Sequence, residues 1–328
     1  DALGAIARCK QLVVVGDERQ LPPTRFFSRM TTESEVDEED DDSYVAGAGD
    51  VESILSLCIA KGMPQLMLRW HYRSRHQSLI AVSNQQFYNS GLFIVPSPYT
   101  ARAGMGLRFH HIPEGRFDSG ATRINRIEAQ TIARAIMAHA LQTPQLSLGV
   151  AAFSLQQKIA IQDELELLRR QQPEAESFFV AHPNEPFFIK NLENVQGDER
   201  DVIFISVAYA RNASGQLPMR FGSVSLDGGE RRLNVLISRA KLRCEVFSSI
   251  TAEDIDLERG KGKGVAALKV FLSYAQTGRL SLAGPDASAQ HSPLEQQVLQ
   301  ALTARGLTVH PNIGIAGLFI DLAVVDAE

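Results

Sequence analysis

Apolar positions repeat with two different periods along the middle of this chain. Between residues 129 and 140, apolar side chains recur every three or four residues, which predicts a helix. The run "LSLGVAAF" follows, short and wholly apolar, as is typical of a buried parallel strand. Residues 161–168 repeat the helical spacing, and "FFIKN" and "DVIFISVA" again have the character of strands.

The same alternation continues toward residue 250. The segment "RRLNVLISRAK" predicts a helix with Leu233, Leu236, Ile237 and Ala240 on one face, and "CEVFSSI" predicts a strand. Strands that alternate with helices across short connections indicate an α/β fold with a covered parallel sheet.

The flanking regions have weaker patterns. Residues 2–9 predict the end of a helix, and 11–15 a strand that runs into "GDERQLPP". "PQLMLRWHYRS" predicts a strand before a polar turn, residues 50–59 a helix capped by Asp50, and residues 76–88 another helix. Near the end, Ser292, Pro293 and Glu295 form a capping-box pattern before a helix, and "LTVHPN" and "GLFIDLAVVD" predict two strands.

Charge is concentrated in one stretch. The net charge of the chain is −5, but residues 33–42 hold eight acidic side chains and no basic one. Removing those eight negative charges from −5 leaves +3, so the acidic total does not exclude a nucleic-acid partner. The stretch lacks periodicity, and we expect a solvated insert there.

The cysteine content and the hydropathy of the chain indicate its cellular environment. The 3 cysteines are far apart and form no CxxC pair, which argues against a disulfide framework or a zinc site. No apolar run is long enough to span a bilayer, and no signal peptide opens the chain. We therefore expect a cytoplasmic protein without a membrane partner, and the first residue, Asp1, suggests a piece of a longer one.

Four segments put charged or amide groups where parallel strands end, which is where α/β sheets bind ligands: "GDERQLPP", "HYRS", "NVQGDERD" and "RRLNVLISRAK". Each alone could be a solvated loop. Together and in this order they resemble motifs III to VI of superfamily 1 helicases of the 5′-to-3′ branch, over about residues 1–250. "GVAAFSLQQKIAI" is similar to the strand and glutamine-rich turn that follow motif IV. The resemblance implies a RecA-like P-loop NTPase lobe that uses ATP and Mg²⁺.

The resemblance also implies roles for particular residues. Gln20 would sense the terminal phosphate, and Arg73 and Arg239 would be phosphate-binding arginines, whose planar fork suits phosphoryl oxygens. The nucleotide-facing set would be Asp17, Gln20, Arg73, Gln196, Gly197, Glu199 and Arg239.

Ordinary structural roles compete with these assignments. Arg239 could be a surface arginine near a helix end, and Arg232 is equally placed by spacing alone. Arg73 could form a salt bridge within the sheet, and Gln196 and Gly197 could form a tight turn. Glu199 could belong to a local ion-pair cluster.

The last stretch resembles the start of restriction-endonuclease-like domains related to very-short-patch-repair nucleases. That resemblance makes Asp321 a catalytic residue and Mg²⁺ ligand, and Glu295 a second candidate ligand. Asp321 could instead end a strand in a turn, and the capping box already explains Glu295.

These observations define an expected organisation. Residues 1–30 would end a first RecA-like lobe, 31–64 would hold the acidic insert and a connecting helix, and 65–276 would form the second lobe. Residues 277–290 would be a linker and 291–328 the beginning of the nuclease-like domain.

The expected function is the C-terminal part of an ATP-dependent helicase with an appended nuclease-like domain. The expected partner is nucleic acid, with DNA and a single-stranded region favoured. No GxxxxGK[ST] sequence occurs in residues 1–328, and in the resembling family both this sequence and the DExx box precede motif III, so we expect this chain alone to lack ATP hydrolysis. The alternative is a degenerate RecA-like module that binds nucleic acid or a protein without catalysis.

Overall fold

The computed structural model describes residues 2–21, 53–97, 104–118, 120, 122–280, 292–315 and 318–324. The chain divides into two compact units, residues 1–68 and 69–328. The acidic insert at 33–42 and most of the expected linker lie outside the described residues.

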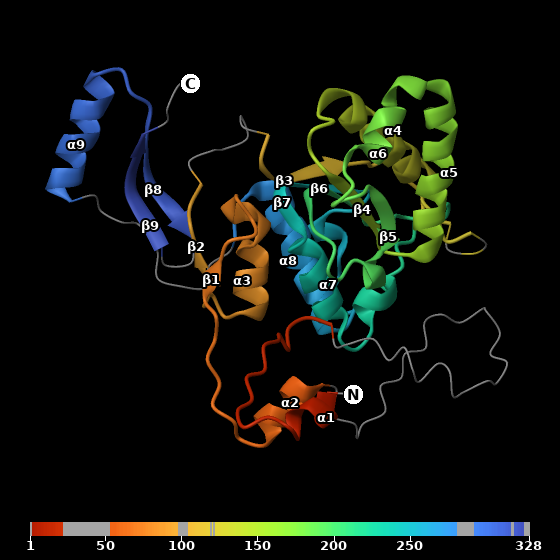
Figure 1. Cartoon of the computed structure of the whole chain (residues 1–328). Helices are drawn as coiled ribbons and strands as arrows, with labels where there is room; N and C mark the ends of the chain where they lie inside the picture. The colour runs from red at the N-terminus through yellow and green to blue at the C-terminus, as the bar shows by residue number, and fades with distance from the viewer. Residues whose placement is uncertain are drawn as a thin grey trace. The chain divides into compact units, whose positions relative to one another are not determined.

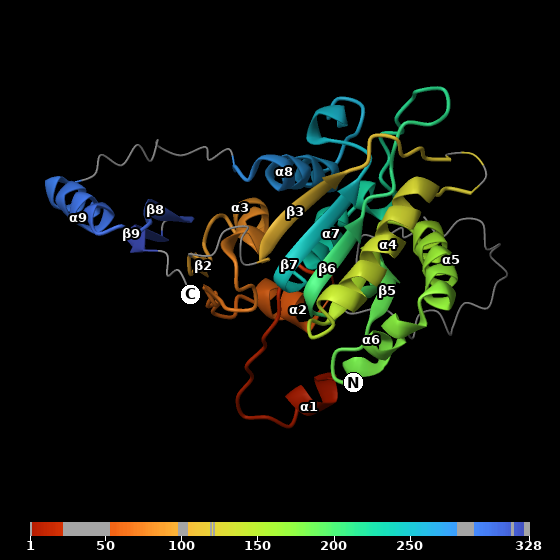
Figure 2. The same cartoon turned by 90° about the horizontal axis from the view of Figure 1, so that it is seen from above.

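A five-stranded parallel sheet forms the centre of the second unit, in the order β3-β7-β6-β4-β5 (Figures 1 and 2). The strands are β3 (Gly106–His111), β4 (Leu148–Ala152), β5 (Phe188–Asn191), β6 (Arg200–Ser206) and β7 (Ala240–Ser248). The predicted α/β class is confirmed. The sequence pattern missed β3, because its alternating polar residues "RFHH" do not form an apolar run.

Helices cover both faces of this sheet (Figure 1). They are α3 (Ala81–Phe87), α4 (Arg126–Gln142), α5 (Leu155–Gln171), α6 (Glu176–Ala181), α7 (Gly229–Ile237) and α8 (Lys263–Thr277). Short 3-10 helices lie at Gln77–Leu79, Pro173–Ala175, Leu192–Asn194, Gly222–Ser225 and Ala252–Asp254. The predicted apolar faces of α4 and α5 are buried: Ile132, Ile136 and Ile161 have no exposed surface.

The helix that contains "RRLNVLIS" is shorter than its pattern predicted. α7 ends at Ile237, the Ser238 hydroxyl donates to the carbonyls of Asn234 and Val235, and Ala240 already begins β7. Ala240 is therefore not on the helix face: its backbone pairs with Arg200 at the start of β6. The missed helix α8 begins within the basic "RGKGKG" stretch, whose glycines obscured the helical pattern.

The first unit contains α1 (Ala2–Ile6) and α2 (Ile54–Ala60). The strand predicted at 11–15 is not observed, and Val13 and Val15 are exposed, because no described segment supplies a pairing partner. Ser53 caps α2, and its side chain accepts a hydrogen bond from the backbone N–H of Ser56. Asp50, which the pattern favoured as the cap, lies outside the described residues.

Two smaller sheets complete the second unit. Only Trp70–His71 (β1) of the strand predicted in "PQLMLRWHYRS" is observed, paired in parallel with β2 (Phe93–Ile94). Near the C-terminus, α9 (Pro293–Ala304) is followed by β8 (Val309–Ile315) and β9 (Leu318–Val324), which pair antiparallel as a hairpin. None of the helices in the described part of the chain has the length and apolar character that a bilayer crossing requires.

Candidate functional site

The site lies at the amino ends of β6 and β7, where a polar turn from far upstream is held against the sheet. The expectation that these polar segments follow the carboxyl ends of strands was wrong, because Glu199 and Arg239 come directly before β6 and β7. The backbone N–H of Arg75 donates to the carbonyl of Lys241 at 2.8 Å, and the Ser74 hydroxyl lies 3.4 Å from the carbonyl of Ala240. The ring of His71 accepts a hydrogen bond from the backbone N–H of Ser74 at 3.1 Å. Burial, with the nearby charge of Arg73, lowers the pKa of His71 to about 4, so this ring is neutral at neutral pH.

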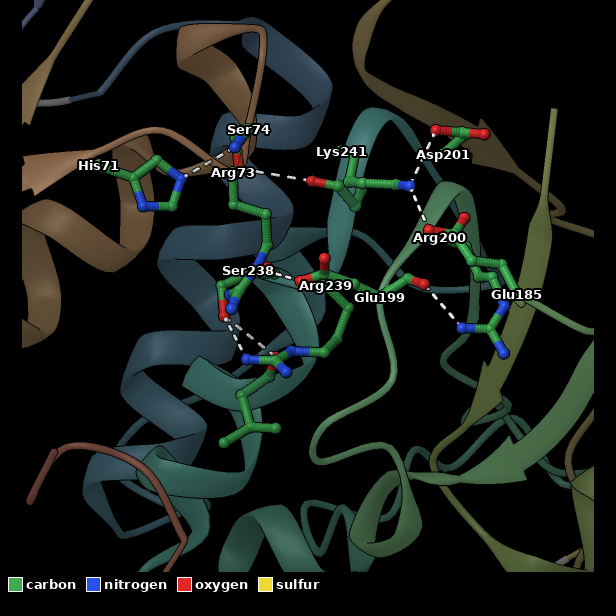
Figure 3. A network of polar contacts seen from close by, with 12 residues as sticks. His71, Arg73, Ser74, Glu185, Glu199, Arg200, Asp201, Ser238, Arg239 and Lys241 are labelled. Atoms are coloured by element: carbon green, nitrogen blue, oxygen red, sulfur yellow. Dashed lines mark hydrogen bonds and ion pairs between the residues drawn. The ribbon is translucent and has the colours of Figure 1, made fainter. Parts of the chain in front are cut away.

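This turn directs Arg73 toward the start of β6 (Figure 3). Its Nε lies 2.6 Å from Oε2 of Glu199, and its Nη1 lies 3.4 Å from the carbonyl oxygen of Ser238. The Arg73 side chain is 32% exposed and the Glu199 side chain 44%, so both remain open to solvent. The local ion pair that competed with a ligand-binding role is therefore present.

Arg239 lies beside the same turn, but only 3% of this residue's surface is exposed. Its Nε donates to the carbonyl of Val235 at 2.8 Å, and its Nη2 lies 3.5 Å from the Ser238 hydroxyl. Burial, and next the positive charge of Arg73, lowers the pKa of Arg239 to about 10, which still leaves it charged at neutral pH. Figure 3 shows both guanidinium groups next to Ser238.

The structure thus brings two of the predicted arginines together. Arg73 is accessible, whereas Arg239 folds back onto its own helix, so only Arg73 presents its guanidinium group to solvent. The pair is balanced locally by the carboxylate of Glu199, with Asp198 nearby. Two positive charges held side by side favour an anionic ligand.

Spacing alone left Arg232 and Arg239 as equal candidates, and the fold separates them. The Arg232 Nη1 donates to the carbonyl of Asp227 at 3.1 Å, and its Nε lies 3.5 Å from Oε1 of Glu193. Arg232 therefore holds the loop before α7, while Arg239 lies at the other end of the helix, next to Arg73.

Gln196 and Gly197 lie in the exposed turn that leads into Glu199. Gly197 has φ +84°, a left-handed conformation that favours glycine. The next residues have structural contacts: Arg200 is buried and donates to the carbonyl of Pro186, and Asp201 pairs with Lys241 at 3.2 Å. The candidate set is therefore the turn 196–199, and not the residues that follow it.

Asp17 and Gln20 belong to the first unit and form a compact turn of their own. The Gln20 side-chain amide donates to Oδ2 of Asp17 at 2.9 Å, and the backbone N–H of Arg19 donates to its Oδ1 at 2.8 Å. The Asp17 side chain holds the turn in this conformation, as Asp side chains commonly do in turns.

The C-terminal candidates are separate from this site. Asp321 is exposed on β9, and Glu295 accepts a hydrogen bond from the backbone N–H of Ser292, which completes the predicted capping box. Among the described residues, no group of three or more His, Cys, Asp or Glu side chains could hold a metal ion.

The sequence patterns did not predict a buried polar cluster that lies at the opposite end of the sheet, where β6 ends. Glu128 is fully buried, and its Oε1 accepts hydrogen bonds from the Ser206 hydroxyl at 2.6 Å and the Ala208 N–H at 2.7 Å. Gln157 bonds both the N–H and the carbonyl of Asn125, at 2.8 and 3.2 Å. The Asn-x-x-Glu spacing at 125–128, a capping-box-like pattern, was the available signal.

This cluster fixes the backbone that leaves β6. Ala208 has φ +69°, an uncommon conformation for a residue with a side chain, and both its N–H and its carbonyl are bonded within the cluster. Burial raises the pKa of Glu128 to about 7, opposed by the hydrogen bonds from Ser206 and Ala208. The cluster is closed to solvent and has a structural role.

Residues 51–251 match an AAA domain family. The chain is 32% identical over 284 residues to an uncharacterized ATP-dependent helicase homolog of Mycoplasma pneumoniae, and 31% identical to its Mycoplasma genitalium counterpart. Each alignment covers 84% of this chain and 24% of the relative, so the chain spans about a quarter of these curated relatives. The C-terminal domain of a possible DNA helicase from Lactobacillus plantarum WCFS1 aligns with 12% identity and a TM-score of 0.31. This alignment covers 59% of this chain and 96% of that domain.

Proposed function

Because the chain belongs to this AAA domain family and is homologous to ATP-dependent helicases, we propose that it is the C-terminal part of a superfamily 1 helicase. Residues 65–276 would form the second RecA-like lobe, and ATP would bind between that lobe and a preceding one. The order of the motifs around Gln20, Arg73, Gln196 and Arg239 supports the 5′-to-3′ branch.

One observation carries this proposal: Arg73 and Arg239 meet at the amino ends of β6 and β7. The contact between Arg73 and Glu199 joins residues 126 positions apart, so the fold itself assembles the pair. A triphosphate would satisfy two adjacent guanidinium groups better than the single carboxylate of Glu199 does.

The proposed mechanism follows from these contacts. Arg73 would exchange Glu199 for the γ-phosphate, and Arg239 would leave the carbonyl of Val235 to reach the same group. Both arginines would then stabilise the charge that develops during phosphoryl transfer. Mg²⁺, bound with ATP by the other lobe, would neutralise charge on the β- and γ-phosphates.

Loss of the γ-phosphate would return Arg73 to Glu199 and Arg239 to its helix. The lobes would then separate, and repeated closure would move the protein along a nucleic-acid strand. DNA is the proposed track because of the nuclease-like resemblance of residues 291–328. There Asp321 and Glu295 would supply Mg²⁺ ligands to a site completed by further residues.

The test uses the full-length protein, including the phosphate-binding lobe that we propose precedes residue 1. Arg73→Ala should reduce DNA-stimulated, magnesium-dependent ATP hydrolysis at least about 100-fold, because a phosphate-binding arginine is lost. Arg75→Ala is the matched control: it lies in the same turn, is exposed, and makes its described contact through the backbone. Equal rates for the two variants would refute the site.

The rival function is a binding module without catalysis, and the chain 1–328 provides a second test. Purified 1–328 should show no magnesium-dependent ATPase, since it lacks a GxxxxGK[ST] sequence. If the full-length protein also lacks hydrolysis but binds nucleic acid, the degenerate module is the correct assignment.

A further inference from the structure

β5 forms one edge of the five-stranded sheet. It pairs with β4 on one side, and no strand in the described part of the chain pairs with its other side. An open strand edge presents backbone N–H and C=O groups that can pair with another chain, and proteins usually protect such edges. The outer side of β5 therefore has unused capacity for pairing.

A groove of about 940 Å³ runs between this strand and α5. Leu165, Phe187, Phe188 and Ile189 contribute its apolar surface, and polar side chains of α5 form the opposite wall. An extended peptide that binds by strand addition uses these two features together: an open edge for its backbone and neighbouring surface for alternate side chains.

Asn191, the last residue of β5, also lines this groove. Its side-chain oxygen Oδ1 is buried and has no hydrogen-bond partner in the described part of the chain. Buried polar atoms are nearly always hydrogen-bonded, and each exception requires an explanation. Because Asn191 also lines the groove, a rotation of its side chain toward the groove would let a donor from a bound molecule supply the missing partner.

The charged side chains that line the groove indicate which kind of molecule would bind there. Four basic side chains line it, and Glu166 and Glu176 are its acids. Each acid is already paired with an arginine of α5, and Lys190 lies 2.6 Å from Asp198. Lys158 has no ion-pair partner among the described residues, so the groove has positive charge to offer. The basic side chains are Lys158, Arg169, Arg170 and Lys190.

We propose that this groove binds an extended, acidic segment of a partner protein, which adds to β5 as a sixth strand of the sheet. A backbone or side-chain N–H of the segment donates to Oδ1 of Asn191, and its carboxylates face Lys158. A nucleic-acid strand also carries negative charge, but it has no peptide backbone to pair with a strand edge. The inference does not depend on ATP binding, so it can fail or succeed separately from the helicase proposal.

The probe is a fluorescein-labelled nine-residue peptide that alternates valine with aspartate, mixed with the chain 1–328 and followed by fluorescence anisotropy. It should bind about tenfold more tightly than the same peptide with lysine for aspartate, because of charge complementarity. A version with N-methylated backbone amides should lose most of the binding, because it cannot pair with β5. Equal binding of all three peptides would overturn the proposal.

Two variants localise the effect. Lys158→Glu should weaken the acidic peptide about fivefold or more, whereas Arg134→Glu, an exposed charge change on α4 outside the groove, should not. Asn191→Leu removes the buried acceptor and should weaken binding while the thermal midpoint of the chain stays the same or rises. Unchanged binding in both groove variants contradicts the proposal.

Hydrogen–deuterium exchange gives an independent readout that does not rely on variants. Peptide binding should slow exchange of the backbone amides in residues 187–191, and should leave β3 at the other sheet edge unchanged. Displacement of the peptide by an oligothymidylate would identify a nucleic-acid groove instead. A dimer of the chain that Lys158→Glu dissociates would identify a second copy as the occupant, and either result overturns the inference.

Discussion

The two ends of the central sheet hold polar side chains in opposite ways. At the amino ends of β6 and β7, Arg73 and Glu199 form an ion pair that remains about one-third to two-fifths exposed, with Arg239 adjacent. At the carboxyl ends, Glu128, Asn125, Gln157 and Ser206 have no exposed surface and are hydrogen-bonded within the cluster. Both clusters connect segments that are distant in sequence.

The difference separates an exposed, charged cluster, for which we propose ligand binding, from a buried cluster that holds the fold. In the first cluster Arg73 pairs with the exposed carboxylate of Glu199, and the second positive charge, Arg239, lies beside it. In the second, burial raises the pKa of Glu128, and amides and hydroxyls complete its hydrogen bonds.

Truncating Arg239 should have the largest effect. In the full-length protein, Arg239→Ala should lower the rate of ATP hydrolysis about 1,000-fold, as expected for loss of an arginine that stabilises phosphoryl transfer. Nucleic-acid affinity, measured by anisotropy, should change little. Arg232→Ala on the same helix is the control, and retained hydrolysis in Arg239→Ala would refute the assignment.

Breaking the buried cluster should destabilise the fold next most strongly. Glu128→Ala leaves the Ser206 hydroxyl and the Ala208 N–H buried without their acceptor, and should lower the free energy of unfolding by about 3 to 4 kcal/mol. Urea unfolding at pH 5.5 measures this. Glu174→Ala, an exposed residue, should change the value by less than about 0.5 kcal/mol.

The same carboxyl group should make stability depend on pH. Its pKa is near 4.5 when exposed and about 7 in the folded chain, so the folded state holds the proton more tightly. The stabilisation is complete below pH 4.5 and is lost as the pH rises through 7, amounting to about 3 kcal/mol.

Urea midpoints at pH 5 and pH 7.5 measure this dependence. The isosteric variant Glu128→Gln has no ionisable group at this position. Its urea midpoint should therefore change less between the two pH values than that of the wild-type chain. A wild-type chain and a variant with the same pH dependence would show that Glu128 is ionised in the fold.

The exposed ion pair should contribute least to stability. Glu199→Gln removes the charge that faces Arg73, and should change the free energy of unfolding by less than about 1 kcal/mol, because exposed pairs are weak. A loss above about 2 kcal/mol in urea unfolding would mean that the cluster of Arg73 and Glu199 has a structural role, like the cluster around Glu128.

The strands and helices of the lobe could be predicted where burial imposes a repeating pattern. "LSLGVAAF" and "DVIFISVA" are apolar because β4 and β6 are central strands covered on both faces. β3 escaped prediction because an edge strand keeps polar residues such as His110, which bonds Glu245. The strand at 11–15 and the capping of α2 were wrong in detail because local pattern does not specify a pairing partner.

Periodicity and capping patterns are enough to predict the α/β alternation, the capping box at Ser292 and the candidate residues of the site. Which of these residues meet depends on the fold: Arg73 reaches Glu199 because Arg75 pairs with β7, and Arg239 rather than Arg232 lies beside it. Helix periodicity places two residues seven positions apart on the same side, so spacing could not separate them. The end of α7 at Ile237 separates them, because it places Arg239 in the turn that enters the sheet.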